Sequence, residues 1–136
     1  MFETFEHTAD VGLRMRASSL AELYAEAARG LFSLIVPDLN SIQRTETVSF
    51  EIEGNDRDYL LFDWLNELLY RYETEHLLLA DFEVDIDNQG LRARAFGERA
   101  DSDRHELDHE VKAITYHGLV VSETDDGWFA ECIVDI

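Results

Sequence analysis

The amino-acid sequence predicts an α+β domain in which two helices pack on one face of a mostly antiparallel sheet of about six strands. Two segments repeat apolar residues at helical spacing, several short runs alternate apolar with polar residues, and the joints between them are short. The chain has 136 residues, 46% of them hydrophobic, which is enough for one ordinary core. We therefore expect a single two-layer domain over residues 1–136.

Helix-start patterns mark both predicted helices. Ser19 is the expected N-cap of the first helix, Glu22 completes a capping box with it, and Pro37 lies beyond its end. Asn55 or Asp56 can cap the second helix. This helix carries a broad apolar stripe that we assign to the core, made of Leu60, Leu61, Trp64, Leu65, Leu68, Leu69 and Tyr72.

About six segments have the period-two alternation that is typical of strands. They lie near residues 11–16, 47–52, 82–86, 91–96, 111–122 and 128–134. The pair Gln89-Gly90 predicts a hairpin turn between two of them, and residues 125–127 (Asp-Asp-Gly) predict another between the last two. The order strand, helix, strand therefore occurs twice along the chain.

Negative charge dominates the composition. The chain has 30 Asp and Glu residues against 11 Lys and Arg residues, a formal net charge of −19, and its only lysine is Lys112. Affinity for nucleic acid comes mainly from Lys and Arg that neutralise phosphates, so we expect no strong direct binding to nucleic acid. The acidic residues are spread along the whole chain, which favours a solvated coat over an interaction tail.

The sequence predicts a cytoplasmic protein that does not associate with membranes. No apolar run approaches the roughly 20 residues needed to cross a bilayer, and residues 1–4 lack the basic and apolar regions of a signal peptide. Cys132 is the only cysteine, so an internal disulfide is excluded and a reducing compartment is favoured. We expect the protein to be a monomer.

One zinc-protease pattern occurs in an acidic stretch at residues 98–110 that has the composition of a mobile segment. Residues 105–109 read His-Glu-Leu-Asp-His and match H-E-x-x-H, in which two histidines on one helical face bind zinc. Such a site needs a stable buried helix and a third ligand, whereas only Leu107 and Val111 are available to anchor this segment. We therefore expect a solvated loop here and no zinc site.

The two ends of the chain supply candidate metal ligands. Asp10 directly precedes a run of alternating apolar and polar residues and should lie at the start of a strand. At the other end, the apolar strand 128–134 runs straight into Asp135 and Ile136, which should hold the terminal carboxylate in the fold. Asp10, Asp135 and the carboxylate of Ile136 would form an all-oxygen cage for a hard divalent cation, with calcium favoured over magnesium or manganese.

Lys112 and the histidines leave alternatives open. Lys112 opens the segment 112–118 and can meet a phosphate or a carboxylate, or can form an ordinary surface ion pair. His7 and His117 are more often hydrogen-bonded structural residues than ligands.

Separated motifs in a fixed order resemble the archease family over essentially the whole chain. They are residues 6–12 (Glu-His-Thr-Ala-Asp-Val-Gly), 65–69 (Leu-Asn-Glu-Leu-Leu), 75–77 (Glu-His-Leu), 112–117 (Lys-Ala-Ile-Thr-Tyr-His) and 135–136 (Asp-Ile). The resemblance implies two interleaved strand-helix-strand-strand units. It also implies a cytosolic protein cofactor of the RtcB-type RNA ligase, which joins RNA ends, notably tRNA halves after intron removal. Such a cofactor promotes guanylylation of the ligase and multiple turnover.

Carried over residue by residue, the resemblance implies a metal site at Asp10, Asp135 and Ile136, and roles in ligase activation for Lys112 and His7. The chain would then be a metal-binding activator and not itself an enzyme. A bound cation can be delivered or positioned near the ligase nucleotide, or the protein can instead shift the ligase between conformations. Two other functions remain open, a free-standing metal-dependent hydrolase and an acidic protein-interaction module without metal.

Overall fold

The computed structural model describes residues 1–7 and 10–136 and gives this part of the chain two α-helices, one short 3-10 helix and seven strands. In chain order they are β1 (Phe2–His7), β2 (Asp10–Ala17), α1 (Leu20–Ile35), η1 (Leu39–Ser41), β3 (Glu46–Glu53), α2 (Arg57–Glu75), β4 (Leu77–Asp87), β5 (Gly90–Arg99), β6 (Ala113–Thr124) and β7 (Gly127–Asp135). The α+β class and the two helices are confirmed.

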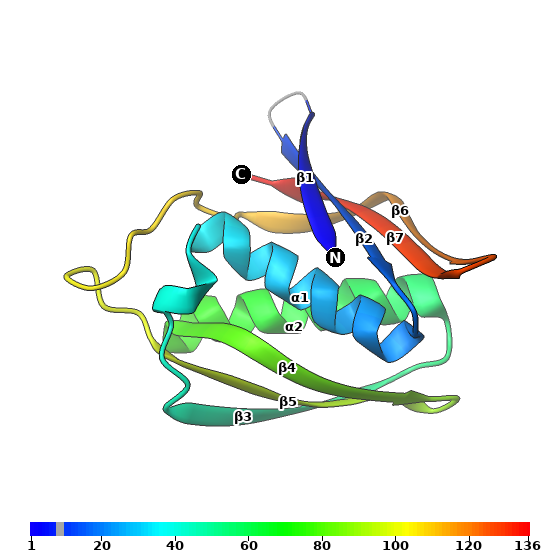
Figure 1. Cartoon of the computed structure of the whole chain (residues 1–136), viewed down its shortest axis with the longest axis horizontal. Helices are drawn as coiled ribbons and strands as arrows, with labels where there is room; N and C mark the ends of the chain where they lie inside the picture. Colours follow the sequence, from blue (N-terminus) through cyan, green and yellow to red (C-terminus); the bar gives the residue numbers. More distant parts are fainter. Residues whose placement is uncertain (8–9) are drawn as a thin grey trace.

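The strands form two antiparallel sheets, and the helices lie between them (Figure 1). The first sheet has the order β1-β2-β7-β6, and the second has the order β3-β5-β4. Helix α1 contacts β2 and β4, and α2 contacts β6 and β3, so each helix touches both sheets. The arrangement is therefore three-layered, and the predicted single sheet with both helices on one face is wrong. Alternation shows that a strand has a buried face, but it does not show which strands share a sheet.

The chain passes through the two sheets in an interleaved way. Its middle, from β3 through α2 to β5, builds the second sheet, while its two ends build the first. The order β3-α2-β4-β5 is a strand-helix-strand-strand unit, and β2-α1-β6-β7 has the same order around it. The interleaving brings the first and last strands of the chain into one sheet.

Strand β1 is absent from the sequence prediction. It is an edge strand that pairs only with β2, from Phe2 opposite Met15 to His7 opposite Asp10. Its large apolar residues, Phe2 and Phe5, are three positions apart instead of two, so the segment does not alternate. The ring of Phe5 lies over Gly12 of β2, at a place where a Cβ atom would fall 2.0 Å from it.

The predicted caps hold both helices in place. The Ser19 hydroxyl accepts the Glu22 N–H at 3.1 Å, and the Asp56 carboxylate accepts the N–H groups of Asp58 and Tyr59 at 3.0 and 3.2 Å. Trp64 is fully buried and donates its indole N–H to the Tyr24 carbonyl at 3.0 Å, which joins the two helices. The apolar stripe of α2 therefore belongs to the core, except that Tyr72 is only partly buried.

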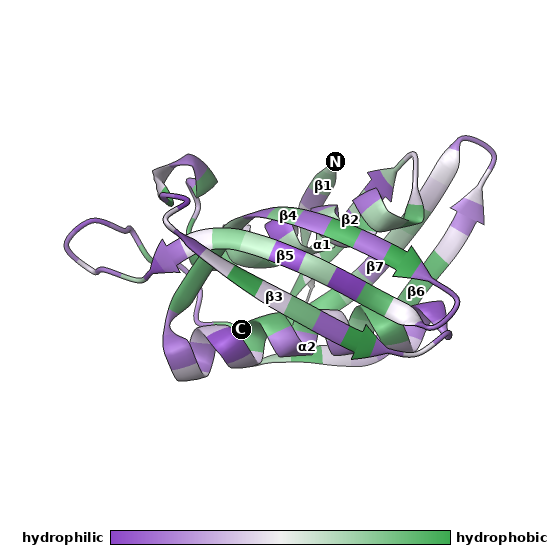
Figure 2. Cartoon of the chain, turned by 90° about the horizontal axis from the view of Figure 1, so that it is seen from below, coloured by the Kyte–Doolittle hydropathy of each residue, from purple (hydrophilic) through white to green (hydrophobic). Residues whose placement is uncertain are grey.

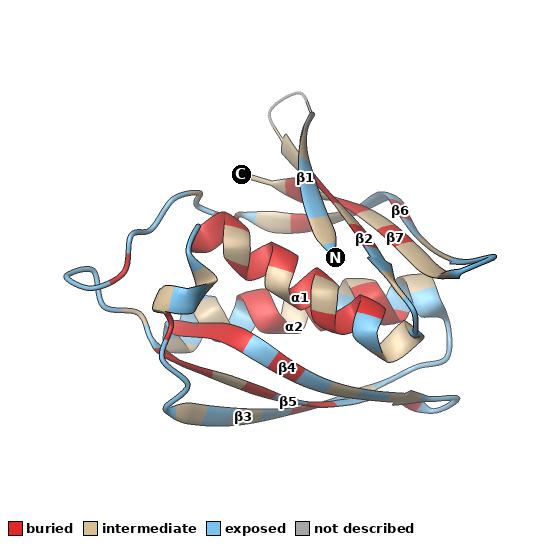
Figure 3. Ribbon diagram, viewed as in Figure 1, coloured by how far each residue is buried: buried red, intermediate tan, exposed pale blue. Residues whose placement is uncertain are grey.

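Burial follows the layers. Buried residues concentrate on the helices and on the inner faces of the strands (Figure 3), and the strands of the second sheet alternate hydrophobic with hydrophilic residues (Figure 2). No helix in the described part of the chain is long and apolar enough to cross a membrane. The outer faces and the edges of the sheets, together with the exposed side of α2, are the surfaces left for function.

Candidate functional site

The first sheet brings the two candidate aspartates side by side. Asp10 opens β2, Asp135 closes β7, and the antiparallel register places them directly opposite each other. Residues that face each other in this way point to the same side of the sheet, with Cβ atoms about 4.5–5.5 Å apart. Figure 1 shows the end of β7 beside the start of β2. Two carboxylates from opposite ends of the sequence therefore lie next to each other.

This carboxylate pair lies on the outer side of the first sheet. Val134 is fully buried and Val11 packs on the core, so these neighbours define the inner face, and alternation turns Asp10 and Asp135 outward. Ile136 follows and also packs against the core. Its packing holds the main chain beyond Asp135 against the fold.

The donors that the structure describes at this place are oxygen atoms. Carboxylate and main-chain oxygens suit calcium, magnesium or manganese, whereas zinc prefers histidine and cysteine. Among the described residues no group of three His, Cys, Asp or Glu side chains is placed to hold a metal ion. A cation at the carboxylate pair would thus take its further ligands from the Ile136 carboxyl group and from water. In donor chemistry the residues fit a hard cation.

Lys112 borders the same place through its backbone. Its N–H donates to the Asp135 carbonyl at 2.8 Å, and the next residue, Ala113, lies opposite Asp135 in the β6–β7 ladder. The Lys112 side chain is exposed, and no carboxylate within the described part of the chain comes within ion-pair distance of its ammonium group. An ordinary surface ion pair is therefore not seen there.

The two candidate histidines, His7 and His117, lie on different strands of the first sheet. His7 stands opposite Asp10 in the β1–β2 ladder, but its side chain, together with Thr8 and Ala9, lies outside the described residues. His117 is exposed on β6, in the part of the strand where the ladder with β7 is interrupted. It is not brought to the carboxylate pair by the register.

The H-E-x-x-H segment is not helical, and both nitrogens of its first histidine are already engaged. His105 is buried, its Nδ1 accepts the Asp101 N–H at 2.9 Å, and its Nε2 lies 2.9 Å from a Glu98 oxygen. Since Nδ1 accepts a hydrogen bond, Nε2 carries the proton and donates it to Glu98. His109 is held by its backbone, whose N–H donates to the Leu34 carbonyl at 3.0 Å, and its Nε2 lies 3.9 Å from a carboxylate oxygen of Asp108. The two histidines do not form a zinc site.

The acidic segment is a mostly exposed loop, as expected, but it is anchored at its start by a buried carboxylate. Glu98 is buried, accepts the Gln43 N–H at 2.6 Å and bonds both Arg104 and His105. The hydrogen bond from Arg104 and that from Gln43 lower the pKa of Glu98 to about 2. Gln43 is 55 positions from Glu98, so no local pattern could have shown the whole cluster.

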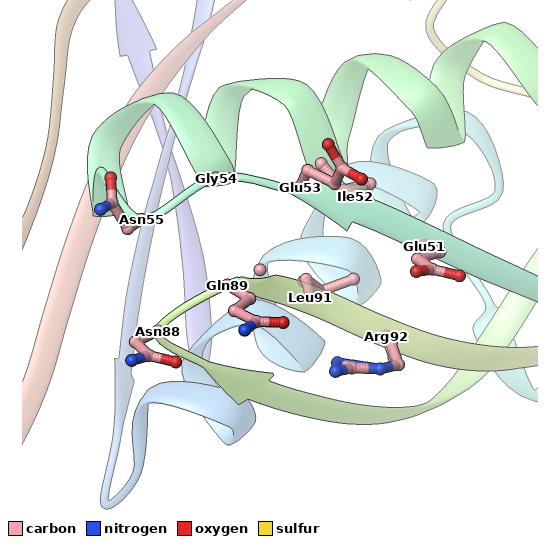
Figure 4. Close-up of a pocket in the computed structure, with 10 residues that line it drawn as sticks. Glu51, Ile52, Glu53, Gly54, Asn55, Asn88, Gln89, Leu91 and Arg92 are labelled. Carbon is pink, nitrogen blue, oxygen red and sulfur yellow. The ribbon is translucent and has the colours of Figure 1, made fainter.

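A hollow in the described part of the surface lies at the second sheet. It has a volume of about 560 Å³ and opens at the end of that sheet, where the β3–α2 and β4–β5 connections meet. In Figure 4 the side chains of Glu53 and Arg92 point away from each other, and the lining groups do not converge on one point. None of its lining residues belongs to the first sheet, which carries the carboxylate pair, and nothing in its lining assigns it a ligand.

Comparisons with known proteins agree on one family. The family model described as "Archease protein family (MTH1598/TM1083)" matches residues 2–136. The archease of Pyrococcus abyssi is 41% identical over 99% of this chain and 98% of its own length, and that of Methanopyrus kandleri is 43% identical over 99% of both. The solution structure of Methanobacterium thermoautotrophicum protein 1598 has a TM-score of 0.86 at 36% identity, covering 99% of this chain and 98% of its own.

A second solved structure shows the fold alone. It is described as an archease, possible chaperone, from Thermotoga maritima and has a TM-score of 0.69 at 22% identity, with 100% of this chain and 98% of that chain covered. The two-sheet architecture is therefore shared with proteins of low sequence identity.

Proposed function

Because the chain belongs to the archease family, we propose that it is a metal-binding activator of the RtcB-type RNA ligase in tRNA splicing and RNA repair, without catalysis of its own. It promotes guanylylation of the ligase and multiple turnover. One observation carries the metal-binding part of this proposal. The register of the first sheet opposes Asp10 and Asp135, two carboxylates on one outer face.

In this proposal Asp10 and Asp135 hold a divalent cation together with the main-chain carboxyl oxygens of Ile136. Calcium is favoured by the oxygen ligands, and magnesium or manganese are compatible with them. The bound cation supplies positive charge that can neutralise phosphate oxygens of the ligase nucleotide. The protein contributes by holding both carboxylates on paired strands, whose ladder hydrogen bonds fix their separation.

Lys112 has the role of a second positive charge in this proposal. The main-chain N–H of Lys112 donates to the Asp135 carbonyl, so the exposed Lys112 side chain begins next to the carboxylate pair. A compact ammonium on a flexible stem can approach a phosphate or a ligase carboxylate once the two proteins meet. His7, opposite Asp10 in the β1–β2 ladder, is assigned to the same activating surface.

The alternatives are less well supported. A free-standing hydrolase needs a general base beside its metal, yet the described residues place no third His, Cys, Asp or Glu side chain with the carboxylate pair. An acidic interaction module without metal would not need two carboxylates opposed on neighbouring strands, where like charges repel. A purely conformational effect on the ligase remains the rival mechanism, and it requires no cation.

A multiple-turnover ligation assay tests the proposal. The ligase is supplied with RNA ends bearing a cyclic phosphate and a 5′-hydroxyl, with and without this protein, its Asp10→Ala form and its Asp135→Ala form. We expect the unmodified protein to raise product per ligase above one and both variants to lose this effect. Asp103→Ala removes an exposed carboxylate of the distant 101–104 turn and should behave like the unmodified protein. Absence of stimulation by the unmodified protein would overturn the activator function.

A further inference from the structure

Three aromatic side chains form a cluster on the surface where α2 meets β6. The rings of Tyr59 and Tyr116 stack with centroids 4.7 Å apart and planes 19° apart, and the edge of Phe62 meets Tyr116 at 5.4 Å and 82°. Tyr59 is 55% exposed and Tyr116 is 40% exposed. We call these three residues the aromatic patch. Stacked rings this exposed are the side chains that most often anchor protein interfaces.

A strand irregularity directs one member of the patch toward the helix. The β6–β7 ladder is regular up to Thr115 and resumes at Val120, so Tyr116 lies in a bulge of the edge strand. The Val121 N–H donates to the Asp58 carboxylate at 2.8 Å, which fastens β6 to the first turn of α2. Bulges commonly turn a side chain to a functional surface. Both β6 and α2 therefore hold the aromatic patch in position.

Carboxylates surround the patch. Burial, the neighbouring Tyr59 and the charges of Asp56 and Asp58 all raise the pKa of Tyr116, so its hydroxyl lies in a negative field. Asp63 is exposed one helical turn beyond Tyr59, on the same face of α2. Rings beside carboxylates make a surface that binds guanidinium groups well, because the cation can stack on a ring and pair with an oxygen.

Elsewhere this chain covers its own aromatic rings with arginine. Guanidinium groups lie 4.1–5.8 Å from ring centroids in five pairs, namely Arg14 over Phe5, Arg16 over Phe129, Arg57 over Trp128, Arg71 over Phe50 and Arg94 over Phe96. Within the described part of the chain, no arginine lies over a ring of the aromatic patch. The patch therefore has the rings and the carboxylates of an arginine site without an arginine of its own.

We propose that the aromatic patch, with Asp63 beside it, is a docking surface for a basic protein that inserts arginine side chains between the rings and the carboxylates. Charge complementarity supports this occupant, because the chain carries a net charge of −19. The same charge disfavours RNA, whose phosphates these carboxylates would repel. This inference rests on the proposed function, since the RNA ligase is the partner that the experiment uses.

The patch and the carboxylate pair are close enough to serve one partner. Ala113 lies opposite Asp135, and Tyr116 follows three residues later on β6. At roughly 3.3 Å per residue, the two places are about 10 Å apart along the strand. The carboxylate pair lies on the outer face of the first sheet and Tyr116 packs against α2, so a partner held at the patch would reach the candidate cation site and Lys112 around the edge strand β6.

Equilibrium binding of purified ligase to labelled protein tests the docking surface. We expect Tyr59→Ala and Tyr116→Ala each to weaken binding by about tenfold or more, as central aromatic anchors do. Tyr70→Ala is the matched control, because Tyr70 is 58% exposed on the same helix and is outside the patch. It should change affinity less than about twofold. Tyr116→Phe keeps the ring and should bind like the unmodified protein, and melting curves should show every variant folded.

A charge reversal separates the two possible kinds of partner. Asp63→Lys should weaken ligase binding by about tenfold, with the difference shrinking at high salt, while the same change at the distant Asp103 should have little effect. Labelled single-stranded RNA alone should bind neither the unmodified protein nor the variants. Binding of RNA that Tyr59→Ala abolishes would overturn the inference in favour of a nucleic-acid surface.

Two results distinguish failure of the docking surface from failure of the activator function. Unchanged ligase affinity in Tyr59→Ala and Tyr116→Ala, with stimulation intact, would overturn the docking surface and leave the activator function standing. No binding of the ligase to the unmodified protein would overturn both.

Discussion

Two opposed carboxylates are the residues on which the proposed chemistry depends. Asp10 and Asp135 face each other across β2 and β7, where like charges repel each other. A cation between them removes the repulsion and binds only the folded chain, in which the strands are paired. Metal binding should therefore be visible as a gain in stability.

The first prediction concerns this gain. Adding calcium, magnesium or manganese to metal-free protein should raise the melting temperature, by the equivalent of about 2.7 kcal/mol when the free metal is 100 times the dissociation constant. Asp10→Ala and Asp135→Ala should melt at the same temperature with and without metal. Thermal melts with chelator and with each metal measure this. An equal response of the unmodified protein and both variants would remove the pair from the site.

Ile136 provides a second prediction. Adding Gly-Ser after Ile136 turns its carboxylate into an amide and crowds the carboxylate pair, so divalent-cation affinity and ligase stimulation should fall together. The fold should persist, because the Ile136 side chain keeps its contact with the core. Calorimetric titration measures the affinity. The same two residues added before Met1 serve as the control, and equal affinity in all three proteins would exclude the carboxyl group of Ile136.

Lys112 should matter to activity and not to stability. Its ammonium is exposed, so Lys112→Ala should abolish ligase stimulation while changing the free energy of unfolding by less than about 1 kcal/mol. Lys112→Arg keeps the charge but not the compact ammonium and should recover stimulation only in part. Urea unfolding and the turnover assay provide the two measurements. Full turnover by Lys112→Ala would leave this residue without a role in activation.

At the scale of elements, the acidic segment between β5 and β6 depends on one buried carboxylate. Glu98 at the end of β5 bonds Arg104, His105 and the Gln43 N–H, and the Asp108 and His109 N–H groups donate to carbonyls at the end of α1. These bonds tie the segment to the C-terminal end of α1 and to the connection before β3. The segment is thus a structural part of the three-layer arrangement.

The stability of this cluster should depend on pH in one direction. The pKa of Glu98 is lowered to about 2 in the folded protein, so its contribution is present above its ordinary pKa and is lost as the pH falls toward 2. Glu98→Gln should lower the free energy of unfolding at pH 7 by on the order of 2 kcal/mol and by less than half as much at pH 3. Urea unfolding at both pH values measures this, with Glu51→Gln as the exposed control. A difference that is equal at both pH values would contradict the prediction.

The whole molecule carries a charge that opposes its own compactness. With a net charge of −19, self-repulsion destabilises the folded state, and salt screens it. Raising potassium chloride from about 0.05 M to about 1 M should therefore raise the melting temperature. The melts are run with chelator present, so that divalent cations do not contribute. A melting temperature that falls with salt would mean that attractive ion pairs outweigh the repulsion.

Sequence reasoning alone determined the elements and the residue types of the candidate site. The Ser19 and Asp56 caps, the stripe around Trp64 and the alternation of most strands are local patterns, because a helix or strand is set by residues a few positions apart. The α+β class and the archease family follow from such patterns and from motif order. Local patterns also single out Asp10, Asp135 and Lys112, through the strand ends and motifs in which they lie.

Tertiary structure decided which of these residues meet. Asp10 and Asp135 are 125 positions apart in the printed numbering, and only the pairing of β2 with β7 opposes them. The same holds for the two sheets in place of one, for His105 buried against Glu98, and for the stack of Tyr59 on Tyr116. The physical reason is that contacts between distant segments depend on how faces pack, and a face with the right period can pack against any complementary layer.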